Sequence, residues 1–178
     1  MELIPVDILQ KADLEFIEKL YIESFPRNER RPLADFHDLI ENESDYVVLL
    51  IVNDDKERIG FITYWKLDLS IFAEHFAIAP EYRNGGNGKN AVELFLSLFD
   101  KPIILEAEIP DTDIAKRRIN FYERLKFKVW KDIEYVQPPY ESEFDAIPMS
   151  ILTYGNIDVE KNLELIKHQL NTKVYRIN

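Results

Sequence analysis

The sequence predicts a mixed α/β (α+β) fold, and three features of the chain support this prediction. Residues 46–52 and 58–65 are apolar runs joined by a short polar turn, which is typical of an antiparallel hairpin. Residues 71–79 form a third strand-like run, followed by a glycine-rich loop and an apolar helical pattern. The run at 102–108 then completes a strand–helix–strand crossover, which joins parallel strands. A hairpin followed by such a crossover indicates a mixed sheet.

The N-terminal elements are predicted from local signals. Residues 1–8 are expected to form a short first strand. Asp13 is expected to cap a helix that Pro26 ends, because proline cannot continue a helix. Pro32 is expected at the first position of a second, short helix.

The C-terminal elements follow in the same way. Asp111 to Asp113 offer N-caps for a helix that runs through Lys126. Residues 127–136 are expected as one strand and residues 148–154 as the last strand. An amphipathic pattern over residues 158–170 predicts a C-terminal helix.

Length and composition limit the class of protein. The chain has 178 residues, so one domain spanning residues 1–178 is expected. Cysteine is absent, which excludes disulfides, cysteine nucleophiles and thiolate metal sites. The three histidines lie far apart in the sequence, so no metal site is expected. We find no signal-peptide pattern and no apolar run long enough for a membrane span, and we therefore expect a cytoplasmic location without membrane attachment.

The chain is acidic, with a formal net charge of −11. This charge disfavours nucleic acid as a partner, because the phosphate backbone is also negative. It would favour a cationic acceptor such as an amine. The same acidity also serves solubility, so both interpretations stay open. Edge strands near the C-terminus would allow pairing across a homodimer.

The glycine-rich loop is the most informative stretch, because it holds three of the five glycines, at positions 85, 86 and 88. Glycine lets the backbone approach a ligand closely. The N-terminus of the following helix adds unpaired N–H groups and a partial positive charge. Together these features predict a seat for phosphate oxygens.

Two known phosphate-binding motifs are candidates for this loop. A P-loop is excluded, because Asn90 follows Gly88-Lys89 where serine or threonine is required, and Arg83 stands in place of the first glycine. A dinucleotide fingerprint fits Gly86-x-Gly88-x-x-Ala91, with Glu106 near the position of a ribose-binding acid. A dinucleotide-binding oxidoreductase therefore remains an alternative. The initial hairpin argues against it, since a doubly wound sheet does not begin that way.

A third motif fits better. The segment Arg83-x-x-Gly86-x-Gly88 resembles the Arg/Gln-x-x-Gly-x-Gly/Ala signature of the GNAT superfamily of acyl-CoA N-acyltransferases. Residues 119–127 resemble the second motif of this family, Phe-Tyr-Glu-x-Leu-Gly-Phe, with Lys126 in place of the usual glycine. The resemblance covers nearly the whole chain and points to a bacterial-type branch. It implies a GNAT-like, mostly antiparallel central sheet with a splayed parallel strand pair, and helices on both faces.

The resemblance implies an N-acetyltransferase that moves an acetyl group from acetyl-CoA directly to a primary amine of a small-molecule or peptide acceptor, without a metal. The glycine loop would hold the pyrophosphate of coenzyme A, and main-chain groups of the preceding strand would bind the pantetheine arm. A non-catalytic acyl-CoA-binding or regulatory module is the alternative within the same fold. The expected cofactor-binding residues are Phe76, Ala77, Ile78, Arg83, Asn84, Gly85, Gly86, Asn87, Gly88 and Lys89.

Catalysis would require one proton acceptor and one proton donor. An amine with a pKa of about 10 is protonated at neutral pH, so a carboxylate has to take its proton, directly or through water. Glu74 and Glu106 are the first candidates for this base, and Glu108 is a further one. The resemblance implies that Tyr122 protonates the leaving thiolate. His75 alternates to the opposite face of the strand from Glu74 and is expected to be structural.

Overall fold

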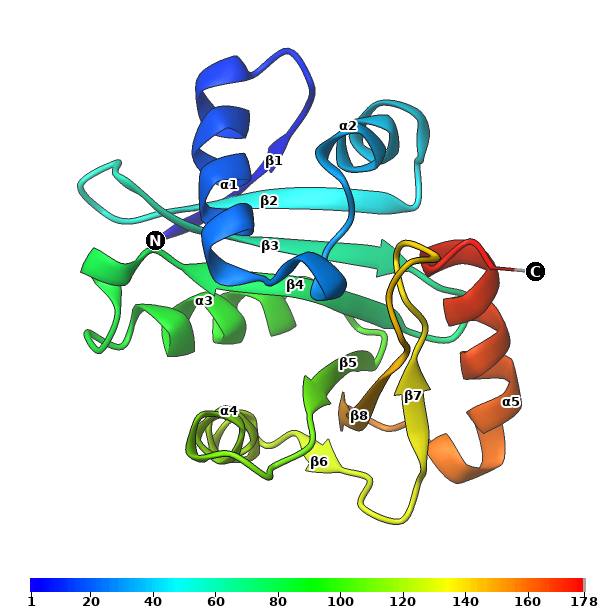
Figure 1. Cartoon of the computed structure of the whole chain (residues 1–178). Helices are drawn as coiled ribbons and strands as arrows, with labels where there is room; N and C mark the ends of the chain where they lie inside the picture. The colour runs from blue at the N-terminus through cyan, green and yellow to red at the C-terminus, as the bar shows by residue number, and fades with distance from the viewer. Residues whose placement is uncertain (178) are drawn as a thin grey trace. The chain divides into compact units, whose positions relative to one another are not determined.

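The computed structural model of the chain describes residues 1–177 (Figure 1). In chain order its elements are β1 (Glu2–Val6), α1 (Lys11–Ser24), η1 (Arg27–Glu29), α2 (Leu33–Asn42), β2 (Tyr46–Val52), β3 (Arg58–Lys66), β4 (Ile71–Ile78), η2 (Pro80–Tyr82), α3 (Asn87–Leu96), β5 (Ile103–Glu108), α4 (Asp113–Arg124), β6 (Lys128–Val129), β7 (Tyr135–Gln137), β8 (Ile147–Tyr154), α5 (Val159–Gln169) and the π-helix η3 (Leu170–Val174). The chain forms two compact units. The first comprises Met1–Lys66 and Ala73–Asp100, and the second comprises Leu67–Phe72 and the chain from Lys101 onward.

The first unit contains an antiparallel meander in which β2 pairs with β1 on one side and with β3 on the other. Helices cover both faces of this sheet. Phe61 of β3 contacts the ring of Tyr21 in α1, with 6.1 Å between the ring centroids. Tyr64 of β3 contacts Phe95 of α3, with 5.5 Å between the centroids. Positions 61 and 64 lie on opposite faces of a strand, so the predicted helices on both faces are confirmed here.

The second unit is built around β8, which pairs antiparallel with β5, β6 and β7. The first residues of β4 also belong to this unit, and the N–H of Ile71 donates to the carbonyl of Pro102 at 2.9 Å. The predicted parallel pairing of β4 with β5 begins at this bond. Because most strand pairs are antiparallel, the predicted mixed fold is confirmed and a doubly wound parallel sheet is excluded.

Several predicted boundaries are correct. The first strand, the last strand and the C-terminal helix form as expected. Thr112, one of the predicted caps, accepts a hydrogen bond from the N–H of Ala115 at 3.1 Å and begins α4. Among residues 1–177, no helix is both long enough and apolar enough to cross a membrane.

Three local predictions are wrong. Gln10, not Asp13, precedes the first turn of α1, because the Asp13 carboxylate instead pairs with Arg58 of β3 at 2.5 Å. Pro32 precedes α2 as its N-cap and does not form its first residue. Residues 127–136 form two short strands, β6 and β7, separated by a turn. The polar and mostly exposed stretch 131–134 explains the break.

Candidate functional site

The predicted phosphate seat is a loop that leads directly into α3 in the first unit. Gly86 is the N-cap of α3 and has φ = 82°, a left-handed conformation that glycine adopts without strain. The first hydrogen bond of the helix runs from the N–H of Asn90 to the carbonyl of Gly86 at 3.0 Å. The N–H groups of residues 86–89 precede that bond and have no acceptor within the helix. Such a helix end is chemically suited to an anion.

Side chains hold this loop in place. The Nε–H of Arg83 donates to the carbonyl of Ile78 at 2.7 Å, and the amide of Asn87 donates to the carbonyl of Tyr82 at 2.9 Å. Arg83 is exposed, and its guanidinium carries further N–H donors beyond the one used in this anchor. Lys89 is exposed and lies 3.7 Å from Glu93. The positive charges predicted for phosphate binding thus lie in the loop, at Arg83, and in the first turn of α3, at Lys89.

Strand β4 leads into the loop with backbone tightly packed against β3. A Cβ atom on Gly60 would lie 2.3 Å from the carbonyl oxygen of Ala77, which is a steric clash. Only glycine, which has no Cβ, fits at this position. Ala77 and Ile78 are buried, and Phe76 is half-buried. The N–H of Ala79 donates to the carbonyl of Ile59 at 2.9 Å, so this group is not available for a ligand.

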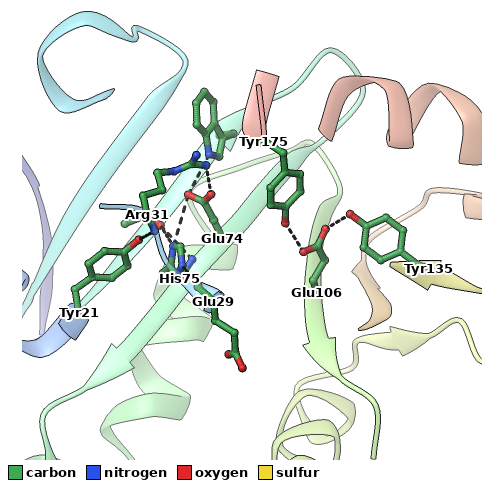
Figure 2. Close-up of polar contacts among 10 residues, drawn as sticks. Tyr21, Glu29, Arg31, Glu74, His75, Glu106, Tyr135 and Tyr175 are labelled. Atoms are coloured by element: carbon green, nitrogen blue, oxygen red, sulfur yellow. Dashed lines mark hydrogen bonds and ion pairs between the residues drawn. The ribbon is translucent and has the colours of Figure 1, made fainter. Parts of the chain in front are cut away.

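Glu74 lies in a buried ion pair in the first unit (Figure 2). Its side chain is 1% exposed and that of its partner Arg31 is 6% exposed. The indole N–H of Trp65 donates to the other carboxylate oxygen at 3.1 Å. Burial acts to raise the pKa of Glu74, but the Arg31 charge and the His75 and Trp65 contacts outweigh it and lower the pKa to about 2. A carboxyl group with such a pKa is a weak base at neutral pH.

His75 makes contacts that fix the surrounding backbone, but the prediction that it faces away from Glu74 is wrong, because its Nδ1 lies 3.6 Å from Oε2 of Glu74. Its Nε2 lies 3.0 Å from the carbonyl oxygen of Glu29, and its backbone N–H donates to the hydroxyl of Thr63 at 3.1 Å. The hydroxyl of Tyr21 accepts the N–H of Arg31 at 2.8 Å. These contacts and the ion pair hold residues 26–31 against the sheet. Arg31 cannot be recognised as the partner of Glu74 from the sequence, since the two residues are 43 positions apart.

Glu106 occupies a different environment, in the second unit. Two tyrosine hydroxyls donate to its carboxylate, that of Tyr135 to Oε1 and that of Tyr175 to Oε2 at 2.5 Å (Figure 2). Glu106 is half-buried. The neighbouring Glu108 points to the surface, where it pairs with Arg118 at 2.6 Å. Tyr175 was not singled out from the sequence, because nothing in its local pattern distinguishes it.

Tyr122, the predicted proton donor, lies in α4 of the second unit. Its ring contacts Phe121 and Phe127, with centroid distances of 5.1 and 5.3 Å. Burial raises the pKa of Tyr122 to about 12, and the charge of Arg118 only partly offsets this. The hydroxyl therefore stays protonated at neutral pH. A cavity of about 690 Å³ opens near the other side of α4 and is lined by the β6–β7 turn and by Tyr135.

Comparison with known proteins identifies the family. The sequence profile of the Acetyltransferase (GNAT) family matches residues 14–127. The chain belongs to the GNAT family. Its membership in this family makes it an acetyltransferase. The predicted GNAT-like fold is confirmed. A search of curated protein sequences finds no match.

Solved structures of GNAT proteins agree with this membership. A GNAT-family protein from Bacteroides thetaiotaomicron, classed as an acetyltransferase, is 40% identical with full coverage of both chains and a TM-score of 0.95. NAA60 of Arabidopsis thaliana, solved with acetyl-CoA, is 17% identical, with 86% of this chain and 97% of that chain covered and a TM-score of 0.60. A mutant of the spermidine N-acetyltransferase SpeG of Vibrio cholerae is 15% identical, with coverages of 86% and 92% and a TM-score of 0.63. The latter two show similarity of fold alone.

Proposed function

We propose that the chain transfers the acetyl group of acetyl-CoA directly to a primary amine. The observation that carries this proposal is the helix end at Gly86, where an exposed, left-handed glycine begins a helix whose first four N–H groups have no helical acceptor. A diphosphate of coenzyme A suits this end of α3. Arg83 in the loop and Lys89 in the first turn of α3 would add positive charge.

The reaction needs no covalent enzyme intermediate. The neutral amine nitrogen attacks the thioester carbonyl carbon, the carbon–sulfur bond breaks, and coenzyme A leaves as a thiolate. We assign removal of the amine proton to Glu106 rather than to Glu74, because the pKa of Glu74 is lowered to about 2 by its buried surroundings and partners. Glu106 is half-buried, and its carboxylate accepts hydrogen bonds from two tyrosine hydroxyls. Water can relay the proton if the two groups do not touch.

Tyr122 is the proposed donor to the leaving sulfur. A thiol has a pKa of about 8.5, whereas the pKa of Tyr122 is raised by burial to about 12. Complete proton transfer is therefore unfavourable by more than three pKa units, and a strong hydrogen bond to the developing thiolate is the better description. A hydrogen bond to a charged group is worth about 1.5–3 kcal/mol. Tyr122→Phe is expected to lower kcat on the order of 10- to 100-fold with little change in acetyl-CoA affinity.

Two variants at one position test the phosphate seat. Gly86→Glu places bulk and a negative charge at the helix end, so acetyl-CoA binding measured by titration calorimetry should be lost. Gly86→Ala is the matched control, because it carries the same left-handed strain without the charge, and its Cβ would have no neighbour within 4 Å. It should bind more weakly than the wild type but measurably. Wild-type affinity in Gly86→Glu would disprove the assignment of the loop.

An amine screen tests the reaction itself. The purified protein is mixed with acetyl-CoA and a panel of amines, and free thiol is recorded over time. Thiol release that depends on a particular amine, with an acetylated product seen by mass spectrometry, supports the transfer. Saturable acetyl-CoA binding without thiol release for any amine would instead indicate the non-catalytic binding module.

A further inference from the structure

The cavity of about 690 Å³ in the second unit lies beside α4 and is distinct from the proposed catalytic groups. Helix α4 contacts β6 and β5, and the turn between β6 and β7 forms the opposite wall (Figure 1). Of the residues that the structure describes, Tyr135 borders this cavity, but Glu106 and Tyr122 do not line it. The cavity is therefore a candidate for a second binding site.

Most of the cavity wall is apolar. Ile119 of α4, Trp130 of the turn and Met149 of β8 line it and are buried. Two further lining residues, Ile109 and Val136, are 45% and 49% exposed. Small-molecule sites have volumes of about 300–1,000 Å³ and mostly apolar and aromatic walls. Exposed apolar side chains beside such a cavity indicate a ligand with an apolar body.

The charge around this cavity is opposite in sign to that of the whole chain. Residues 114–131, from α4 to the turn after β6, contain seven lysine or arginine residues and one acidic residue, Glu123. Their net charge is +6, whereas that of the chain is −11. All seven cationic residues are exposed. A local excess of one sign of charge attracts ligands of the other sign, so this segment favours an anion.

Two of these cations line the cavity itself. Lys116 comes from α4, and Lys131 comes from the β6–β7 turn. Within residues 1–177, neither ammonium group forms an ion pair or a hydrogen bond. Glu123 and Glu134 also line the cavity, so the lining charges balance and the excess of positive charge comes from the flanking residues. An anionic group is therefore favoured where it contacts a lysine and disfavoured next to either glutamate.

We propose that this cavity binds a small amphipathic carboxylate, a molecule with an apolar aliphatic or aromatic body and one anionic group. The body would lie between α4 and the turn, against Ile119 and Trp130, and the carboxylate would contact Lys116 or Lys131. A ligand without the charge would leave the cations unused, and one without the apolar body would leave the wall exposed to water. The inference concerns binding alone and does not depend on the proposed acetyl transfer.

Octanoate is the probe, and its binding is measured by titration calorimetry and by 15N NMR of the Trp130 indole N–H. The chain has two tryptophans, so Trp130→Phe identifies this signal. The indole N–H donates to the hydroxyl of Thr153 at 2.9 Å, which fixes the ring at the cavity wall. Octanoate should shift the signal saturably. It should bind at least about tenfold more tightly than acetate, which lacks the body, and than octyltrimethylammonium, which has the opposite charge.

Charge variants of the lining test the position of the carboxylate. The double variant Lys116→Gln, Lys131→Gln should weaken octanoate binding about three- to tenfold, because two exposed charge contacts are lost. Glu123→Gln should strengthen it about two- to threefold by removing a repulsion. Arg124→Gln is the matched control, because Arg124 is an exposed cation of α4 that does not line the cavity. It should change the affinity by less than about twofold at physiological salt.

Equal affinity for octanoate and octyltrimethylammonium, or wild-type affinity in the double lysine variant, overturns the inference. Saturating acetyl-CoA should leave octanoate binding unchanged. If acetyl-CoA displaces octanoate, the cavity belongs to the cofactor site and a second site is refuted. Binding to phosphatidylglycerol vesicles without binding of monomeric octanoate also refutes it, because a membrane surface would then be the ligand. Octanoate binding in a protein that acetylates no amine would support this inference and contradict only the proposed function.

Discussion

Replacement of Glu74 by glutamine tests the buried ion pair with Arg31 most directly. Glutamine preserves the size of the side chain and can still accept the indole N–H of Trp65, but it removes the charge. The pKa of Glu74 falls from 4.5 to about 2, because Arg31, His75 and Trp65 outweigh the opposing effect of burial. One pKa unit corresponds to about 1.4 kcal/mol. The ionised carboxylate thus adds about 3 kcal/mol to the free energy of unfolding at neutral pH.

The direction of the pH dependence follows from the lowered pKa. The contribution is complete above the pKa of the unfolded chain and disappears as the pH falls through the pKa of the folded chain. We therefore expect the wild type to lose about 2 kcal/mol of this stabilisation between pH 7 and pH 3. Glu74→Gln cannot lose it. At pH 7 the variant should be less stable by about 3 kcal/mol or more, because Arg31 stays buried without its counter-charge.

Urea-induced unfolding at pH 7 and pH 3, followed by tryptophan fluorescence, measures the free energy of unfolding of the wild type and of Glu74→Gln at each pH. Glu108→Gln is the matched control, because Glu108 pairs with Arg118 at the surface, where ion pairs contribute less than about 1 kcal/mol. The difference in the free energy of unfolding between the wild type and Glu74→Gln should be smaller at pH 3 than at pH 7. The difference between the wild type and Glu108→Gln should be small at both pH values. A difference of less than about 1 kcal/mol at pH 7, or one independent of pH, would refute the reasoning.

Two further predictions concern the backbone. Gly60→Ala should destabilise the first unit by about 1–3 kcal/mol and weaken acetyl-CoA binding, because its Cβ would lie 2.3 Å from the Ala77 carbonyl oxygen in β4. Thermal unfolding measures the loss of stability, and calorimetry measures the loss of acetyl-CoA affinity. Wild-type values in both measurements would contradict the close approach of the two strands. Lys126→Gly should raise the free energy of unfolding by about 1 kcal/mol, because Lys126 has φ = 67°, where glycine is not strained. Lys128→Gly at a strand position serves as the control and should destabilise.

The turn at Lys126 shows how far the motif predicts local structure. The second motif places a glycine here, and the sequence alone left open whether lysine changes the turn. The backbone keeps the left-handed conformation, and the N–H of Phe127 donates to the carbonyl of Tyr122 at 3.1 Å. Packing of Leu125 and Phe127, both buried, outweighs the cost of one strained residue. The local sequence could not show this, because the cause lies in tertiary contacts.

The sequence by itself determined the class of fold, most of its helices and strands, and the glycine loop before α3. These features depend on apolar periodicity, turn residues and conformational limits of single residues, all of which are local. Thr112 illustrates this, since it caps α4 as its position predicted.

Only the tertiary structure decided which partners surround the two candidate bases, Glu74 and Glu106. Glu74 and Glu106 occupy similar strand positions in the sequence, yet one is neutralised by a buried arginine and the other is held by two tyrosine hydroxyls. The partners come from residues 29 to 69 positions away, with Arg31 at 43 positions from Glu74 and Tyr175 at 69 from Glu106. The charge state of a carboxylate depends on such neighbours and on its exposure to water. Neither property is encoded in the local pattern of the chain.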